Sequence, residues 1–275
     1  MSIVGLEERT EALRTILRGM GKVAIAYSGG ADSTLLLAMA MESAEAIAVL
    51  CDSEIFSPSQ RDEAIRTAWS LGAPLRIVRC DHLSLPGFVK NDEDRCYHCK
   101  RLMYSEVVRV AEEERFRTVA DGELIDDIGR PGSRAAREYG VRSPLAEAGL
   151  GKEDVLVLLD RMGIEVPAKD TCAATRIPVG ETLERKRLRL VIEAEEAVRG
   201  LGIDLVRVRL HGEHARIEVL PEDMDTVLSH RTELVSDLRD LGLVHVSLDL
   251  QGYRYGSMSE RSHGGSGEPD PGDEG

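Results

Sequence analysis

The stretch SGGADS, Ser28 to Ser33, places two glycines, an aspartate and two serines directly after the apolar run VAIAY. Gly29 and Gly30 allow close approach to the backbone, so several N–H groups and a helix N-terminus can converge on an anion. Ser28 and Ser33 add donors, and Asp32 is best explained by a magnesium ion that accompanies the phosphates. The alternative is a Gly-Gly turn whose Asp or Ser caps a helix. The stretch SGGADS is not a Walker A loop, because the Gly-Lys-Ser/Thr ending is missing.

Three of the five cysteines have positions that suit sulfur or metal chemistry. Cys96 and Cys99 lie three residues apart at a predicted helix start, and Cys172 follows much later. Three thiolates suit a 4Fe-4S cluster with one iron left open for an extra sulfide. Zinc would need a fourth ligand, which His82 or another residue could supply. A redox CxxC pair, or three unrelated thiols, are the other interpretations.

Charged and polar residues beside these motifs are further candidates. Lys100 and Arg176 each lie near a candidate cysteine and could neutralise a phosphate or lower a thiol pKa, or they could be solvated surface charges. Asp52 and Ser53 end the second apolar run, where the base and ribose of a nucleotide lie in related sheets, or they form only a turn.

A third group lies late in the chain, where Arg207, Arg209 and His211 alternate along one predicted strand. They share a face if strand pairing is regular. Guanidinium groups at that spacing suit a substrate phosphate. The alternative is that the arginines pair with acids such as Glu218.

Short apolar runs alternate with helical periods in the first half of the chain. The pattern predicts strands at 22–26, 46–51, 75–80 and 118–120, and helices at 33–43, 59–71 and 100–114. Such a βαβ series forms a parallel sheet, with SGGADS at its carboxyl edge, where ligands bind. Beyond 129–136 the pattern predicts helices at 152–162, 183–201 and 222–241, a strand–turn–strand at 205–220 and a strand at 244–250.

We therefore expect an α/β protein with a parallel-sheet domain at 1–180 and a smaller α+β domain at 181–255. Residues 256–275 read as a disordered acidic tail. The net charge of -14 disfavours nonspecific nucleic-acid binding. No apolar run approaches the roughly 20 residues of a membrane span, and no secretion signal is visible, so we expect a cytoplasmic protein. In that compartment Cys51 and Cys80, which end apolar runs, are expected to be core residues rather than part of a disulfide framework.

The motif SGG-x-DS after a first strand resembles the PP-loop of ATP pyrophosphatases, which split ATP between its α and β phosphates. Further stretches are similar to the LarE family: NDEDRCYHCK, DGELIDDIGRPG, VRSPLAEAGLGKEDV, CAATRIPVG and RVRLHGEHARIEV. The resemblance covers most of residues 5–250. The chain departs from the family at 121–124, where members usually read Asp-Gly-Thr-Asn, and at 175–180, where they read Ser-Arg-Phe-Pro-Tyr-Gly.

The resemblance implies a fold like that of adenine nucleotide α-hydrolases, with ATP and Mg²⁺. It also implies that the protein adenylates a carboxylate of pyridinium-3,5-biscarboxylic acid mononucleotide and converts it to a thiocarboxylate, on the route to the nickel-pincer cofactor of lactate racemase. A sulfide or other sulfur donor and a homo-oligomer, trimeric or hexameric, follow from the same resemblance.

Some members of that family have only the equivalent of Cys172 and give up its sulfur, whereas others have three cysteines. This chain resembles the second kind. We therefore expect Cys172 to be both catalytic and a cluster ligand, and to stay intact. Two other functions stay open: a tRNA thiolase, which normally has an RNA-binding module and a basic face, and a noncatalytic protein that binds a nucleotide or a cluster.

Overall fold

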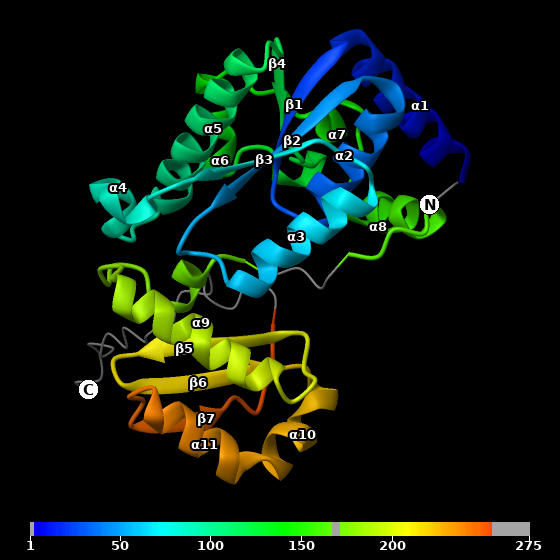
Figure 1. Ribbon diagram of the computed structural model, residues 1–275. Helices are drawn as coiled ribbons and strands as arrows, with labels where there is room; N and C mark the ends of the chain where they lie inside the picture. Colours follow the sequence, from blue (N-terminus) through cyan, green and yellow to red (C-terminus); the bar gives the residue numbers. More distant parts are fainter. Residues whose placement is uncertain (1–2, 167–170, 255–275) are drawn as a thin grey trace, which may run out of the picture.

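A four-stranded parallel sheet forms the centre of the first part of the protein. The computed structural model describes residues 3–166 and 171–254, so the tail predicted at 256–275 lies outside the described residues. The strands run in the order β3-β2-β1-β4 (Figure 1). Their bounds are β1 Lys22–Tyr27, β2 Glu45–Asp52, β3 Leu75–Arg79 and β4 Thr118–Ala120. All four predicted strands are confirmed.

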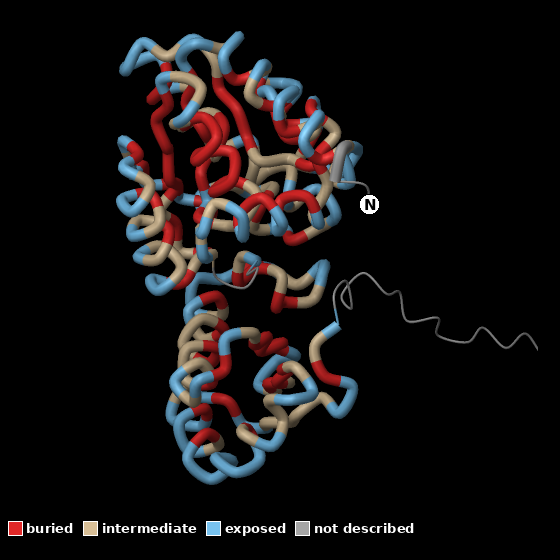
Figure 2. The backbone as a smooth tube through the Cα atoms, turned by 90° about the vertical axis from the view of Figure 1, so that its right-hand side faces the viewer, coloured by how far each residue is buried: buried red, intermediate tan, exposed pale blue. Residues whose placement is uncertain are grey.

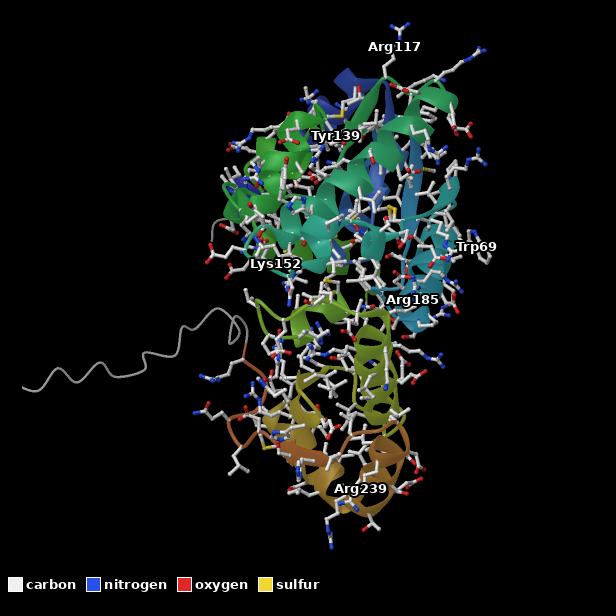
Figure 3. All side chains as sticks on the ribbon, turned by 90° about the vertical axis from the view of Figure 1, so that its left-hand side faces the viewer. Trp69, Arg117, Tyr139, Lys152, Arg185 and Arg239 are labelled. Carbon is white, nitrogen blue, oxygen red and sulfur yellow. A yellow bond between two sulfur atoms is a disulfide. The ribbon has the colours of Figure 1, made fainter. Side chains whose placement is uncertain are left out.

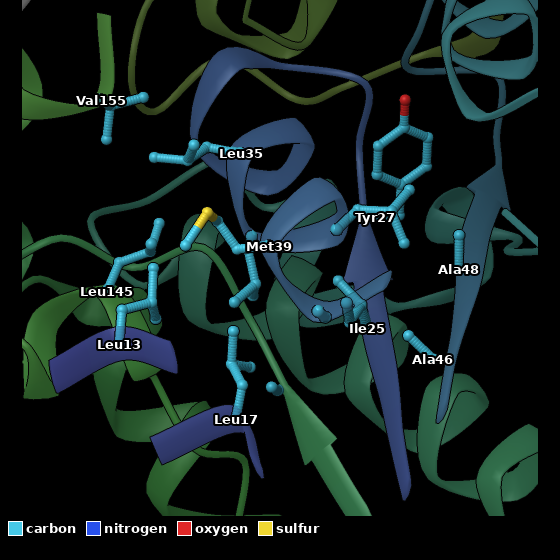
Figure 4. Packing of buried hydrophobic residues seen from close by; sticks show 14 of the residues in the cluster. Leu13, Leu17, Ile25, Tyr27, Leu35, Met39, Ala46, Ala48, Leu145 and Val155 are labelled. Atoms are coloured by element: carbon cyan, nitrogen blue, oxygen red, sulfur yellow. The ribbon is translucent and has the colours of Figure 1, made fainter. Parts of the chain in front are cut away.

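Strand β1 is buried on both sides because helices cover both faces of the sheet. Val23, Ile25 and Tyr27 belong to one core and Ala24 to the other, as the alternation of a strand requires. Figure 4 shows the first core, in which side chains of α1 and α2 meet those of β1 and β2. Helices α1 (Ile3–Met20), α2 (Ala31–Ser43), α3 (Pro58–Ser70) and α8 (Lys152–Arg161) contribute to this core, and α5 (Arg95–Glu113) and α6 (Pro131–Glu138) to the other.

The strand order reverses beside β1. The chain moves outward from β1 through β2 to β3 and then returns to β4 on the other side of β1. Loops that leave the carboxyl ends of β1 and β4 therefore diverge at a switch point, where open parallel sheets bind ligands. Short elements connect the rest of this part: η1 (His82–Ser84), α4 (Pro86–Val89), η2 (Ile125–Asp127) and α7 (Pro144–Glu147).

The second part is a three-stranded sheet with helices against it (Figure 1). Strands β5 (Val206–His211) and β6 (His214–Val219) form an antiparallel hairpin, and β7 (His245–Leu248) pairs parallel to β6. Helix α9 (Arg185–Arg199) confirms the helix predicted at 183–201. The prediction of one continuous helix at 222–241 is wrong. The chain there forms three elements: η4 (Pro221–Asp223), α10 (Met224–Ser229) and α11 (Arg231–Asp240).

The segment that carries Cys172 packs between the two parts. The amide of Ala173, the first residue of η3 (Ala173–Arg176), donates to the carbonyl of Ile55 at 2.8 Å, and that of Leu183 donates to Val89 at 2.9 Å. Ile55 and Phe88 share a core with the second sheet. Figure 2 shows buried backbone inside both parts. The domain boundary at residue 180 stays a prediction.

Two of the sequence expectations need correction here. Cys51 and Cys80 are buried as predicted, but they are joined in a disulfide. The parallel pairing of β2 with β3 places these two strand ends side by side, which brings their Cα atoms to 5.8 Å. The helix predicted at 100–114 begins at Arg95, so Cys96 and Cys99 both lie in its first turns.

Among the helices that the structure describes, none combines the length and the apolar character that a membrane span requires.

Candidate functional site

The SGGADS loop turns sharply between β1 and α2. Gly29 has φ +77°, and a Cβ there would lie 2.5 Å from that of Ala64, so only glycine fits. The Ser33 hydroxyl accepts from the Ser28 amide at 3.2 Å and donates to the Gly30 carbonyl at 3.1 Å. These bonds shape the loop, and the amides at the start of α2 point along the helix axis toward the edge of the sheet.

A cavity of about 410 Å³ opens in front of this loop. Ser28, Gly30, Asp32 and Ser33 line it from the loop side. Cys96 and Lys100 line it from helix α5, and Asp121 and Gly122 line it from the end of β4. The cavity therefore unites the predicted phosphate loop with one of the three cysteines.

Asp32 has an ion partner that the sequence analysis did not identify. The Nζ of Lys152, at the start of α8, donates to Asp32 Oδ1 at 2.7 Å. Figure 3 shows Lys152 near the junction of the two parts. Asp32 and Asp121 both line the cavity, which fits Mg²⁺, because this ion is commonly bound by one or two carboxylates together with substrate phosphates. The only sequence signal for Lys152 was its place in the stretch GLGKEDV.

Lys100 stands in a short polar network with Tyr104 and Asp121. Its Nζ donates to the Tyr104 hydroxyl at 3.1 Å, and that hydroxyl donates to Asp121. Desolvation opposes the charge of the amine, but Tyr104 and Asp121 outweigh it and raise the pKa of Lys100. Lys100 is therefore a cation in the cavity, available to a phosphate.

Asp52 and Ser53 line a smaller cavity of about 100 Å³ that shares Ser28 and Gly30 with the first one. Phe56 and Arg61 line its other walls. This position beside the phosphate loop agrees with a nucleotide site, and the individual roles of Asp52 and Ser53 stay predictions.

Ser53 also connects this cavity to Cys99 through His82. The Ser53 hydroxyl lies 2.7 Å from His82 Nδ1, and Cys99 Sγ lies 3.3 Å from His82 Nε2. Burial lowers the pKa of His82 to about 4, so the imidazole is neutral at neutral pH. The contact between His82 and Cys99 joins η1 to α5 and places beside a candidate cysteine the histidine that the zinc alternative named.

The three unpaired cysteines come from two segments: Cys96 and Cys99 lie one turn apart in α5, and Cys172 packs against the same core as Cys99. Burial raises the pKa of Cys99, and the neighbouring thiols of Cys172 and Cys96 raise it further. Burial also raises the pKa of Cys172, against the effect of Arg95. Cys96 is exposed, whereas Cys99 and Cys172 are half-buried. Within residues 3–166 and 171–254, no three His, Cys, Asp or Glu side chains are close enough to form a metal site.

Arg176 is buried, with 1% of its surface exposed, so the interpretation of this residue as a solvated surface charge is wrong. Its Nε donates to Glu195 at 2.6 Å and its Nη1 to the carbonyl of Cys172 at 3.3 Å. The guanidinium therefore ties the Cys172 turn to helix α9. A direct contact of Arg176 with the α-phosphate stays a prediction. Lys100 lines the same cavity as the loop that would hold this phosphate.

Arg207 and Arg209 are buried on β5, while His211 is exposed at its end. Arg209 donates to Glu218 at 3.1 Å, as the alternative interpretation predicted, and to the carbonyl of Thr175 at 2.9 Å. Arg207 donates to the Val206 carbonyl and lies over the ring of Tyr253. Desolvation lowers the pKa of His211.

The contact of Arg209 with Thr175 places this arginine next to the turn that carries Cys172. A phosphate bound by the β5 arginines would therefore lie close to the candidate sulfur site. Whether these residues bind a phosphate stays a prediction.

Three curated proteins provide a comparison over nearly the whole chain. The pyridinium-3,5-bisthiocarboxylic acid mononucleotide synthase of Lactiplantibacillus plantarum is 34% identical over 93% of this chain and 95% of its own. An uncharacterised protein of Synechocystis sp. is 34% identical over 92% of this chain and 98% of its own. An uncharacterised protein of Methanocaldococcus jannaschii is 30% identical over 85% of this chain and 91% of its own. No family model matches. With this identity and coverage, and with an SGGADS loop at the carboxyl edge of a parallel sheet, the chain belongs to the LarE family.

Proposed function

We propose that this protein is an ATP-dependent sulfur transferase that converts a carboxylate of pyridinium-3,5-biscarboxylic acid mononucleotide into a thiocarboxylate, a step toward a nickel-pincer cofactor. The observation that carries the proposal is the composition of the main cavity, where the SGGADS loop, Lys100 and Cys96 face the same space. The name of the Lactiplantibacillus plantarum relative supplies the substrate.

The first half-reaction makes the carboxylate electrophilic. A carboxylate oxygen attacks the α-phosphorus of ATP, the bond to the bridging oxygen breaks, and pyrophosphate leaves. The loop amides and Lys100 stabilise the charge that develops on the phosphates, since they are fixed in place before the reaction. Mg²⁺ beside Asp32 would neutralise the pyrophosphate.

The second half-reaction transfers sulfur. A sulfide sulfur attacks the acyl carbon, a C–S bond forms, and the C–O bond to AMP breaks with release of AMP. Cys96, Cys99 and Cys172 are the residues that we propose to hold the sulfur carrier. Supporting this assignment, Cys96 and Cys99 lie one turn apart in α5, and Cys99 and Cys172 pack against the same core. A 4Fe-4S cluster on the three thiolates would supply an open iron for the sulfide.

The β5 arginines complete the proposed site. Arg207 and Arg209 bind the single phosphate of the mononucleotide in this proposal. The bond from Arg209 to the Thr175 carbonyl supports it, because Thr175 lies three residues from Cys172. By family resemblance we also propose that the protein is a cytoplasmic homo-oligomer, trimeric or hexameric.

The test is product analysis with ATP, Mg²⁺ and the carboxylated pyridinium mononucleotide. We expect AMP and pyrophosphate, and ADP with phosphate would contradict the proposal. Asp32→Asn should abolish turnover. Glu45→Gln is the matched control, because Glu45 pairs with Lys22 at the same 2.7 Å distance but at the start of β2, away from the loop. Turnover with tRNA in place of the mononucleotide would indicate a tRNA thiolase.

A second experiment addresses the sulfur. Anaerobic reconstitution should give about four irons per chain, and Cys→Ala at any of the three positions should release them. Mass spectrometry after several turnovers with sulfide should find Cys172 intact. Conversion of Cys172 to dehydroalanine, with one sulfur transferred per chain, would show a sacrificial mechanism instead.

A further inference from the structure

Asn91 has an unusual backbone conformation for its residue type. In the described part of the chain, twelve glycines but only two other residues, Asn91 and Arg115, have positive φ. Asparagine tolerates this region better than most residues, yet glycine adopts it without steric cost. A turn alone would therefore favour glycine at position 91, and the asparagine side chain must contribute something else.

The Asn91 side chain is fully buried and binds the segment that follows Cys172. Its Nδ2 donates to the carbonyl of Pro178 at 2.8 Å and to that of Glu181 at 2.9 Å. The Asn91 carbonyl accepts from the Gly180 amide at 2.9 Å. Three bonds from one residue thus hold a segment about 90 positions away in the sequence.

Asn91 is also connected to the helix that carries the other two cysteines. Its Oδ1 accepts from Arg95 Nη1, and Arg95 is the first residue of α5. The same nitrogen of Arg95 lies 3.3 Å from the carbonyl of Ala174, two residues beyond Cys172. Asn91 and Arg95 together therefore bridge the start of α5 and the segment that directly follows Cys172.

We propose that Asn91, with the Arg95 that it holds, is a positioning residue that sets the Cys172 thiol against the Cys96–Cys99 pair. The functional meaning of this geometry rests on the proposed sulfur transfer. The left-handed backbone at Asn91 is retained because it aims the amide at two carbonyl groups, and strained conformations of this kind gather where the surroundings hold a site in place.

The test measures thiol geometry without requiring activity. Reduced protein is treated with a short bis-maleimide well below its melting temperature, and crosslinked peptides are quantified by mass spectrometry. The Cys96–Cys99 crosslink is an internal reference, because these residues are one turn apart in α5 and do not depend on the Cys172 segment. The readout is the ratio of Cys99–Cys172 to Cys96–Cys99 crosslinks.

Asn91→Gly keeps the backbone conformation and removes the amide, and we expect it to lower that ratio at least fivefold. Arg115→Gly, at the other non-glycine position with positive φ, is the matched control and should leave the ratio unchanged. An unchanged ratio in folded Asn91→Gly, or an equal fall in Arg115→Gly, would overturn the proposal. If Asn91→Gly does not fold, Arg95→Met decides: we expect at least a twofold fall, and no fall overturns the proposal.

A kinetic measurement separates this inference from the proposed function. In Asn91→Gly, ATP should still be converted to AMP, whereas thiocarboxylate formation per AMP should fall at least fivefold. Wild-type protein that forms no AMP would contradict the proposed function and leave the crosslinking result valid. Full coupling in the variant would overturn the positioning role.

Discussion

Gly122→Ala is expected to damage the nucleotide site although the alanine side chain is small. Gly122 follows β4 and approaches the first turn of α2 more closely than any side chain allows. A Cβ at Gly122 would lie 2.8 Å from the Ser33 amide nitrogen and 2.9 Å from the Asp32 carbonyl carbon. Both are backbone atoms, so no rotamer change can relieve the contact.

The size of the effect follows from these distances. Favourable contacts begin near 3.5 Å, so the end of β4 and the start of α2 must separate by roughly 0.7 Å. Overpacking of this kind costs about 1–3 kcal/mol of unfolding free energy. A displacement approaching 1 Å at the phosphate loop costs on the order of 10- to 100-fold in turnover.

The assay is calorimetric binding of a nonhydrolysable ATP analogue, together with thermal unfolding and turnover. Gly19→Ala is the matched control, since nothing lies within 4 Å of a Cβ at that position in α1. It should be neutral or stabilising by up to about 1 kcal/mol, because alanine is the better helix former. Gly122→Ala protein that binds the analogue and turns over like the wild type would refute the argument.

Two further predictions concern buried charged and titratable groups. Burial lowers the pKa of His82 to about 4, so between about pH 6.5 and pH 4 the unfolded chain binds a proton that the folded protein does not. The unfolding free energy should therefore decrease by up to about 3 kcal/mol as the pH is lowered from about 6.5 to about 4. Urea unfolding of wild-type and His82→Phe protein checks this, and parallel pH profiles would contradict it. Arg209→Ala should lower the unfolding free energy by about 3 kcal/mol, because it breaks a buried pair with Glu218. It should also raise the KM for the mononucleotide without weakening ATP binding, and an unchanged KM would assign Arg209 to the fold alone.

The sequence was sufficient for the parallel sheet and the phosphate loop, since both depend on local pattern. The apolar run before Ser28 could only be a buried strand followed by a turn, and its helix begins within two residues of the predicted start. The helix α1 was not predicted, although Leu6, Leu13 and Leu17 share a buried face. The polar residue Thr10 is buried on this face between Leu6 and Leu13, and it interrupts the apolar period.

Long-range contacts were beyond the reach of spacing. The pairing of Asp32 with Lys152 joins residues 120 positions apart, and the contact of His82 with Cys99 depends on how η1 packs on α5. The break in the helix predicted at 222–241 also escaped the pattern. There His230 has φ -99° and ψ 12°, outside the helical region, and this conformation separates α10 from α11.

Under the proposed function, the division of the site between two sheets separates the consumption of ATP from the choice of acceptor. The phosphate loop belongs entirely to the first sheet, and the arginines Arg207 and Arg209 belong entirely to the second. A gene that exchanged the second part for another module would keep its energy source and acquire a new substrate. Sulfur transferases of this architecture can therefore diversify by recombination at the Cys172 segment, without redesign of the chemistry that activates the carboxylate.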